Sequence, residues 1–161
     1  MRRTESERAI DLAYKAVARR DLTVAELRAG LERKHVPPEA IDDAVAELEA
    51  TGFLDDARYA MQFAEDKREL EQWGTERIAQ DLRRRGIERQ LIDAAVSTYD
   101  RDSELRTAYL LLERRYPTAP RDDRERDRAW QMLVRRGYSP ELAYDAIRAY
   151  ERAERERRRA A

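Results

Sequence analysis

Apolar residues recur along this chain at the spacing of amphipathic helices, and the whole pattern repeats every 51 residues. In each repeat, four apolar positions follow the i, i+3, i+4, i+7 rule that puts side chains on one face of an α-helix. These positions are Ile41, Ala44, Val45 and Leu48, then Ile92, Ala95, Val96 and Tyr99, then Ala143, Ala146, Ile147 and Tyr150. Leu31, Leu82 and Leu133 coincide at the same period without a gap. A fixed period of this length predicts tandem copies of one helical unit.

The pattern predicts an all-α fold of three tandem three-helix repeats. The expected repeats cover residues 1–51, 52–100 and 101–161, the last with a charged C-terminal helical extension. The expected helices are 5–20, 24–34 and 38–50, then 56–70, 75–85 and 89–99, then 102–116, 121–136 and 140–157. Because a unit of about 50 residues buries little surface, we expect neighbouring units to share contacts in an elongated row that can curve.

Residues at the expected helix ends agree with these boundaries. Thr23, with Glu26 three residues later, has the sequence of a capping box. Gly86 and Gly137 follow Arg-rich segments, at the place where a left-handed residue ends a helix. His35 occupies the equivalent position in the first repeat, so we expect it to end a helix with a positive φ. A metal-binding or catalytic role for this single histidine would need partners that the sequence lacks.

Composition fits surface helices and excludes several classes of protein. Hydrophobic and charged residues each make up 42% of the chain, with only 5 glycines and 5 prolines. The absence of cysteine excludes disulfides, zinc ribbons and thiolate nucleophiles, and it suits the reducing cytoplasm, where we expect the protein. No window approaches about 18 uninterrupted apolar residues, so we expect no secretion signal and no membrane span. Without a sustained heptad seam, we expect a monomer.

The sequence offers no recognisable catalytic centre. It has one histidine and no P-loop, GxGxxG or HExxH pattern, so we expect a protein that is not an enzyme and needs no cofactor or metal. Acidic pairs such as Asp55-Asp56 and Asp122-Asp123 flank expected helix starts, where carboxylates cap exposed N–H groups. The chain is therefore expected to act by binding a partner.

A cluster of cations recurs where each second helix is expected to end. The candidate partner-binding residues are Arg33, Lys34, Arg83, Arg84, Arg85, Arg135 and Arg136. One interpretation is purely structural, since a cation in the last turn of a helix stabilises its carbonyl end by about 0.3–1 kcal/mol. The other is a ladder of cationic points, one per repeat, that binds a long acidic or polyanionic partner which itself repeats.

Base-specific DNA recognition is not favoured by this sequence. The formal net charge is only −1, from 33 basic and 34 acidic residues. The third helix of the first repeat would have to enter a DNA groove, yet it carries Glu39, Asp42, Asp43, Glu47 and Glu49, which would repel phosphates. Weak, nonspecific contact with single-stranded DNA through the cations stays open.

The sequence resembles a known family in an ordered set of segments. Gly-Phe-Leu-Asp-Asp-Ala-Arg-Tyr-Ala at 52–60, then Phe63, then Trp-Gly-Thr-Glu-Arg-Ile at 73–78, is similar to the signature that joins the first two repeats of RecX regulatory proteins. Arg-Arg-Arg-Gly-Ile at 83–87, Thr-Val-Ala-Glu-Leu at 23–27 and Leu-Val-Arg-Arg-Gly-Tyr at 133–138 extend the resemblance over about Glu7 to Tyr150. His35 departs from the glycine expected in the first repeat, and Trp73 stands where many relatives have other residues.

The resemblance implies a modulator of the RecA recombinase in DNA recombination, DNA repair and the SOS response. Such a protein lies along the RecA nucleoprotein filament and usually suppresses its ATPase, strand-exchange and coprotease activities. The family has no agreed catalytic residues, so the seven candidate cations rest on their positions alone. Two other functions stay open from the sequence: a nonspecific DNA-binding or nucleoid protein, and a helical scaffold for an unrelated complex.

Overall fold

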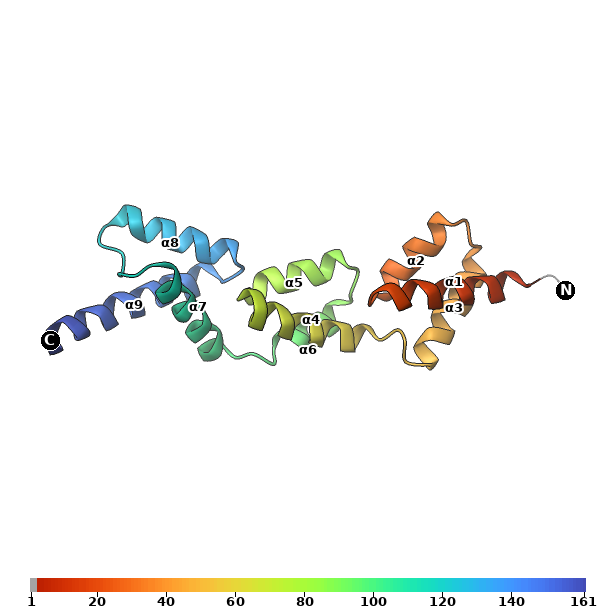
Figure 1. The fold of residues 1–161 in the computed structure, drawn as a ribbon, viewed down its shortest axis with the longest axis horizontal. Coiled ribbons are helices and arrows are strands. Elements are labelled where there is room, and N and C mark those ends of the chain that lie inside the picture. The colour runs from red at the N-terminus through yellow and green to blue at the C-terminus, as the bar shows by residue number, and fades with distance from the viewer. Residues whose placement is uncertain (1–2) are drawn as a thin grey trace. The chain divides into compact units, whose positions relative to one another are not determined.

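The computed structural model describes residues 3–161, so Met1 and Arg2 of the expected first repeat lie outside the described residues. Over this range the chain forms nine α-helices and no strand (Figure 1). The helices are α1 (Glu5–Arg19), α2 (Val24–Arg33), α3 (Pro38–Ala50), α4 (Asp56–Glu71), α5 (Thr75–Arg84), α6 (Arg89–Val96), α7 (Arg101–Arg115), α8 (Asp123–Arg135) and α9 (Pro140–Ala160). The all-α prediction is confirmed, and the helices follow one another in three sets of three.

The described helices belong to two compact units. The first unit contains the chain up to Gln62 together with Asp81–Ala95, and the second contains Phe63–Gln80 together with Val96–Ala161. Helices α4 and α5 therefore contribute residues to both units. The expected repeat boundaries and the elongated row stay predictions, for which the radius of gyration from solution scattering is the appropriate measurement.

Local capping explains where most helices begin. Thr23 and Glu26 form the predicted capping box at α2, with reciprocal hydrogen bonds of 3.1 and 3.0 Å. The Asp122 carboxylate accepts a hydrogen bond of 2.9 Å from the N–H of Glu125, so α8 begins at Asp123, two residues after the expected start. The starts of these helices are thus fixed by side chains three residues away in the sequence.

One helix ends earlier than its apolar pattern predicts. The expected helix 89–99 stops at Val96, whose carbonyl oxygen accepts a hydrogen bond of 2.9 Å from Nη2 of Arg68. Tyr99 lies outside the helix, where its hydroxyl is 2.6 Å from Oγ1 of Thr107 and its ring lies 4.5 Å from the Arg68 guanidinium carbon. The Arg68 side chain of α4 therefore donates the hydrogen bond that a further turn of α6 would have donated to the carbonyl of Val96.

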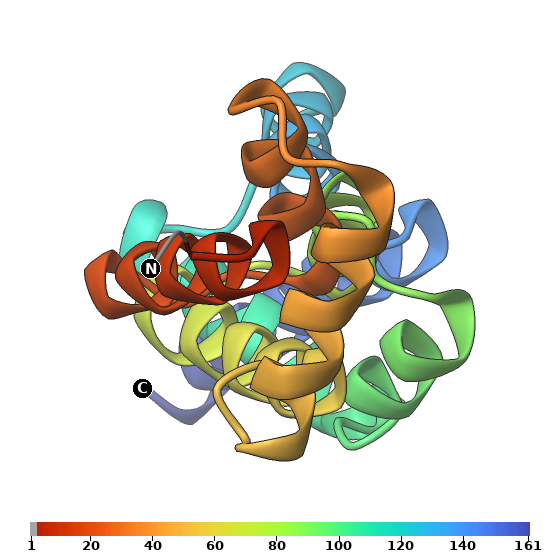
Figure 2. The ribbon, with the colours of Figure 1, turned by 90° about the vertical axis from the view of Figure 1, so that its right-hand side faces the viewer.

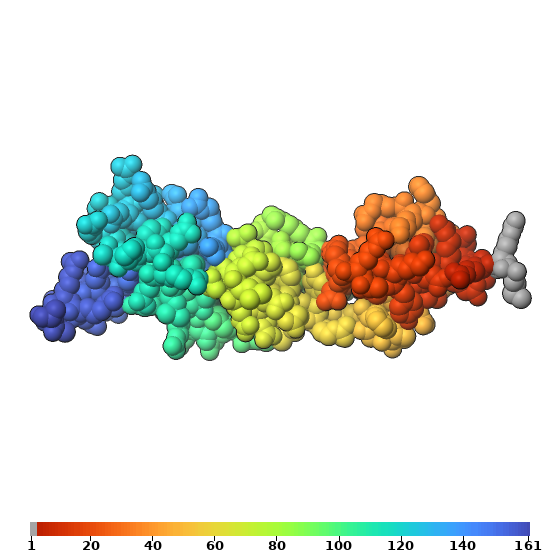
Figure 3. Space-filling model, viewed as in Figure 1, coloured from red at the N-terminus to blue at the C-terminus, as the bar shows by residue number. Residues whose placement is uncertain are grey.

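The core of the first unit lies between α1, α2 and α3. Helix α1 packs against α3, and Figures 1 and 2 both show the two helices side by side. Leu27, Leu31 and Leu48 are at most 2% exposed at their centre. In the space-filling view the atoms of this unit form a continuous outer surface, without an opening to the core on the face that is shown (Figure 3). No helix in residues 3–161 is long and apolar enough to cross a membrane.

The second unit has its main core between α7, α8 and α9. Leu112, Leu133, Tyr138 and Tyr150 are at most 2% exposed there. Leu31 and Leu82 are also buried, so Leu31, Leu82 and Leu133 occupy equivalent core positions, as the 51-residue period predicts. The repeat period therefore reflects a repeated packing arrangement.

Candidate partner-binding surface

All seven candidate cations lie at the carboxyl-terminal ends of the second helices. Arg33 is the last residue of α2 and Lys34 follows it as the C-cap. Arg83 and Arg84 occupy the last turn of α5, with Arg85 immediately after it. Arg135 ends α8, and Arg136 is its C-cap. The structure therefore places the seven side chains at equivalent positions, as their sequence spacing indicates.

Left-handed residues end these three helices. His35, Gly86 and Gly137 have φ angles of 59°, 82° and 101°. The prediction that His35 adopts the conformation of the two glycines is confirmed. The only histidine follows the C-cap of α2 and is exposed. Among residues 3–161, no three His, Cys, Asp or Glu side chains lie together as a metal site.

Five of the cationic side chains are exposed and make no side-chain hydrogen bond or ion pair with another residue in the described part of the chain. These are Arg33, Lys34, Arg83, Arg84 and Arg135. Each repeat contributes at least one of them. A cation at a helix end is already favoured by the helix dipole, but its exposed donors remain available to a carboxylate or phosphate.

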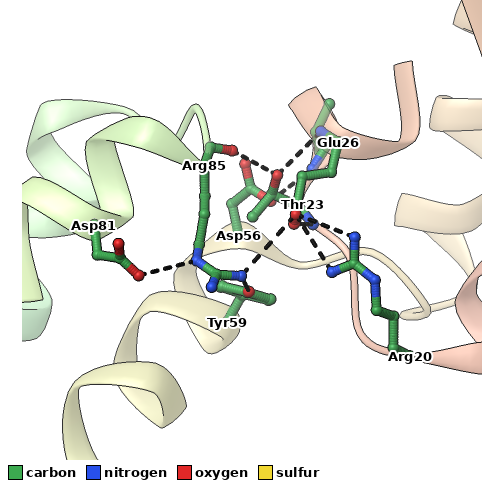
Figure 4. A network of polar contacts seen from close by, with 8 residues as sticks. Arg20, Thr23, Glu26, Asp56, Tyr59, Asp81 and Arg85 are labelled. Atoms are coloured by element: carbon green, nitrogen blue, oxygen red, sulfur yellow. Dashed lines mark hydrogen bonds and ion pairs between the residues drawn. The ribbon is translucent and has the colours of Figure 1, made fainter. Parts of the chain in front are cut away.

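Arg85 is held within the protein instead. Its Nη1 donates a hydrogen bond of 2.7 Å to the hydroxyl of Tyr59, and its Nε lies 3.4 Å from an Asp81 oxygen. The Glu26 carboxylate lies 4.0 Å from Nη1 (Figure 4). The side chain is half-buried, so these contacts limit how far it can reach toward a partner.

Arg136 is likewise engaged, although its partner is backbone. Its Nη1 donates a hydrogen bond of 2.6 Å to the carbonyl of Glu71 at the end of α4. Arg136 is half-buried, whereas the preceding Arg135 is exposed. The sequence gives no reason to distinguish Arg135 from Arg136. They differ in exposure and in hydrogen bonding because α4 packs against α8.

The end of α5 that carries Arg83, Arg84 and Arg85 rests on the beginning of α2. The hydroxyl of Thr23 donates a hydrogen bond of 2.7 Å to the carbonyl of Arg85, as Figure 4 shows. The N–H of Val24 donates to the Asp56 carboxylate at 2.9 Å. The carbonyl end of one helix thus meets the N–H end of another, an arrangement in which the two helix dipoles attract.

Charge is concentrated at this joint between α2 and α5. Burial raises the pKa of Asp56, and the hydrogen bond from Val24 offsets part of the rise. The nearby carboxylates of Asp55, Glu88 and Glu26 raise the pKa further. Arg20 lies 3.4 Å from Glu26 on the other side of the joint (Figure 4). The joint is therefore a polar contact between helix ends, and it fixes the backbone from which the arginines project.

A corresponding joint occurs in the second unit, where the end of α8 rests on the beginning of α5. The N–H of Gly74 donates to the carbonyl of Arg136 at 2.7 Å, and the N–H of Glu76 donates to the carbonyl of Gly137 at 3.0 Å. Glu104 accepts from the N–H of Thr75 at 2.7 Å, as Asp56 does from Val24. The joined helix ends, at Arg85 and Arg136, are one repeat period apart, whereas the acidic acceptors Asp56 and Glu104 are 48 residues apart.

Sequence reasoning did not identify the joint residues as a group. A partial signal was present for Arg85, because Asp81 precedes it by four residues and such pairs face each other on a helix. Gly74 carried another signal, since a glycine often marks a place where another backbone approaches closely. No local signal marked Arg136, whose acceptor lies 65 residues away.

The fold and surface together define a class of all-α proteins made of tandem three-helix units. Comparison with known proteins gives the family. Residues 9–48, 55–96 and 102–147 match the first, second and third three-helix domains of RecX. These segments cover most of the chain, and they follow in the order that the repeats predict.

Similar proteins carry the same description. The regulatory protein RecX of Deinococcus radiodurans is 34% identical over 147 residues, which are 91% of this chain and 70% of that protein. The regulatory protein RecX of Trichlorobacter lovleyi is 37% identical over 135 residues, covering 81% of this chain and 87% of the relative. The chain belongs to the RecX family of regulatory proteins.

Solved structures share the fold. A crystal structure of RecX from Lactobacillus salivarius has a TM-score of 0.82 at 17% identity, with 91% of this chain and 97% of that chain covered. A second crystal structure of a regulatory protein RecX has a TM-score of 0.75 at 23% identity, with 90% of this chain and 72% of that chain covered. The relatives are named as regulatory proteins and not as enzymes.

Proposed function

We propose that this protein binds the RecA nucleoprotein filament and inhibits the ATPase, recombinase and coprotease activities of RecA. It would do so in the cytoplasm, as a monomer and without a catalytic step or a cofactor. Membership of the RecX family supports the regulatory part of this proposal. The proposed contact with the filament is supported by the exposed cationic side chains without ion pairs at the end of each second helix.

A repeating partner suits this arrangement. Each repeat of the chain offers one or two free cations from a backbone that is fixed by helix packing, and a filament offers acidic groups or phosphates at regular intervals. Linked weak contacts gain affinity through effective concentration, even when each contact alone is slight. In this proposal Arg33, Lys34, Arg83, Arg84 and Arg135 contact the filament, while Arg85 and Arg136 mainly hold the ends of α5 and α8 in position.

Charge reversal of two free arginines tests the proposal. The variant Arg84→Glu/Arg135→Glu should raise the concentration needed to inhibit RecA ATPase on single-stranded DNA by about tenfold or more, which corresponds to about 1.4 kcal/mol. Its inhibition should also depend less on salt, because fewer ionic contacts are lost on screening. Circular dichroism checks that the helices are intact.

The matched control reverses two arginines that share the same helical context. Arg115 and Arg159 are exposed, lie in the last turns of α7 and α9 and make no ion pair within the described chain, but they do not belong to second helices. Arg115→Glu/Arg159→Glu changes net charge equally and helix-dipole energy similarly, and it should inhibit RecA as the wild type does. If the Arg84 and Arg135 variant also inhibits at wild-type concentrations, the cations serve only to end helices and the contact lies elsewhere.

Binding of the wild-type protein to bare single-stranded DNA and to the RecA filament distinguishes the two alternative functions. A nonspecific DNA-binding protein would bind bare single-stranded DNA as tightly as the filament, and both affinities would fall in parallel with salt. A scaffold for an unrelated complex would bind neither. Preference for the filament over bare DNA is the result expected from the proposal.

A further inference from the structure

The third repeat has a groove between α8 and α9 that the proposed cation ladder does not use. It encloses about 370 Å³ and lies entirely within the second unit. Its walls are formed by Trp130 and Asp127 of α8 and by Tyr144, Ile147 and Arg148 of α9. Tyr144 is 52% exposed, although it is among the large hydrophobic side chains of the protein. The groove is thus lined by two aromatic rings and by charged groups.

Comparison along the repeat period indicates that a three-helix unit can form without this aromatic pair, although Trp130 also packs against the core between α7, α8 and α9. One period earlier the positions of Trp130 and Tyr144 are occupied by Ala79 and Asp93. Two periods earlier they are occupied by Arg28 and Asp42, which form an ion pair of 2.8 Å between α2 and α3. Because the same three-helix unit forms with an ion pair or without one, the two rings of the third repeat call for a separate explanation.

The geometry of the rings suits a cationic group. The indole N–H of Trp130 donates a hydrogen bond of 3.1 Å to the carbonyl of Pro140, which fixes the plane of the ring. The Arg148 guanidinium carbon lies 5.2 Å from the centre of the Tyr144 ring, and its Nε donates to the Tyr144 hydroxyl at 2.9 Å. The groove therefore already holds one guanidinium against an aromatic face, and indole is the better of the two surfaces for a second cation.

The charges around the groove favour a cation over an anion. Arg126 is paired with Glu151 at 2.7 Å and with Asp123 at 2.7 Å, and Arg148 lies 3.8 Å from Glu151. Asp127 accepts a hydrogen bond of 3.1 Å from the amide of Gln131 and makes no ion pair within residues 3–161. One carboxylate at the edge of the groove is thus uncompensated. A phosphate would be repelled by it, so a nucleic acid is the wrong ligand for this surface.

We propose that the groove between α8 and α9 binds an arginine or lysine side chain of the protein partner. The methylene groups of that side chain would lie on Trp130, and its charged group would pair with Asp127. That the partner is the RecA filament rests on the proposed function, whereas the chemistry of the ligand rests on the groove. Binding through this groove adds a contact with the Trp130 ring to the ionic contacts of the cation ladder.

The first experiment uses the full chain and no RecA. N-acetyl-Ala-Arg-Ala-amide is titrated against ¹⁵N-labelled protein, with the matching citrulline peptide as the uncharged control. The arginine peptide should shift the indole resonance of Trp130 and leave that of Trp73 unchanged. Asp127→Asn should weaken the titration by about threefold or more, since it removes the charge and keeps an acceptor for Gln131. An unmoved Trp130 resonance, or equal shifts with citrulline, overturns the proposal.

The second experiment asks whether the filament is the partner. Asp127→Lys should weaken binding to RecA filaments by about threefold to thirtyfold, because it places a cation where one must enter. Glu76→Lys is the matched control, since Glu76 is the exposed residue one period before Asp127. If the peptide binds but Asp127→Lys binds filaments as the wild type does, the filament does not use the groove. If the wild type binds no filament, the proposed function fails. The peptide titration still shows whether the groove binds an arginine side chain.

Discussion

Replacing Gly86 by alanine should destabilise the protein much more than replacing Gly52 by alanine. Both glycines lie in the first unit just after a helix end, and their φ angles are nearly the same, 82° and 81°. They differ in their surroundings. A Cβ atom on Gly52 would meet nothing within 4 Å, whereas one on Gly86 would overlap the Cβ of Ala25 at the start of α2. The comparison therefore separates backbone strain from the close approach of two helices.

The expected losses of stability follow from two effects, backbone strain at a positive φ and steric overlap between α5 and α2. A left-handed conformation costs a residue with a Cβ about 1–2 kcal/mol, so Gly52→Ala should lower the free energy of unfolding by about that amount. Overpacking a well-packed contact adds about 1–3 kcal/mol, so Gly86→Ala should lower it by about 2–5 kcal/mol. Part of the second loss is the hydrogen bond from Thr23 to the carbonyl of Arg85, which cannot survive if α5 moves away from α2.

Urea unfolding followed by circular dichroism measures both changes, and a compensating substitution tests the cause. Ala25→Gly removes the atom that Gly86→Ala would strike, so the double variant should be more stable than the sum of the single effects by about 1–3 kcal/mol. If Gly86→Ala costs no more than Gly52→Ala, or if the double variant shows simple additivity, the close contact between α5 and α2 does not limit residue 86.

Two further predictions concern the same helix ends. His35→Gly should leave the free energy of unfolding unchanged or raise it by up to about 1 kcal/mol, because glycine relieves the left-handed strain but gains freedom in the unfolded chain; clear destabilisation in urea would contradict this. Asp56→Asn should stabilise the protein at pH 7 relative to the wild type. The folded pKa of Asp56 is raised, so the charged form is unfavourable above that pKa and the penalty disappears as the pH falls below the unfolded value. The advantage of the Asp56→Asn variant over the wild type should therefore shrink between neutral pH and about pH 3, where the carboxyl is protonated in both states, and an advantage that grows on acidification would refute the assignment.

Local sequence rules were sufficient for the helices and for the positions of the cations. Helix starts depend on side chains such as Thr23, which caps an N–H three residues away. The positive φ of His35 follows from its place after a helix, because a left-handed residue is the common way to end one. The 51-residue period likewise places Arg33, Arg84 and Arg135 at equivalent helix ends. In all these cases the interacting groups lie within one or two helical turns, so sequence spacing is enough.

Only the tertiary structure distinguished residues that the period makes equivalent. Arg85 and Arg136 are engaged by groups 26 and 65 residues away, whereas Arg84 and Arg135 are free within the described chain. Gly86 and Gly137 are required at their positions because the preceding repeat approaches them closely, and a β-carbon on Gly137 would lie 2.6 Å from the nitrogen of Arg77. His35 is exposed, so a side chain is tolerated there in the same left-handed conformation.

The early end of α6 and the groove beside Trp130 both result from packing between segments that are distant in the sequence. Arg68 satisfies the carbonyl of Val96 from another helix, which no apolar pattern in residues 89–99 could reveal. Trp130 and Tyr144 lie 14 residues apart in sequence and line one groove only because α8 and α9 pack together. The sequence determines which residues can form helices and end them, since those energies are local. Which side chains remain free for a partner is decided by packing between distant segments.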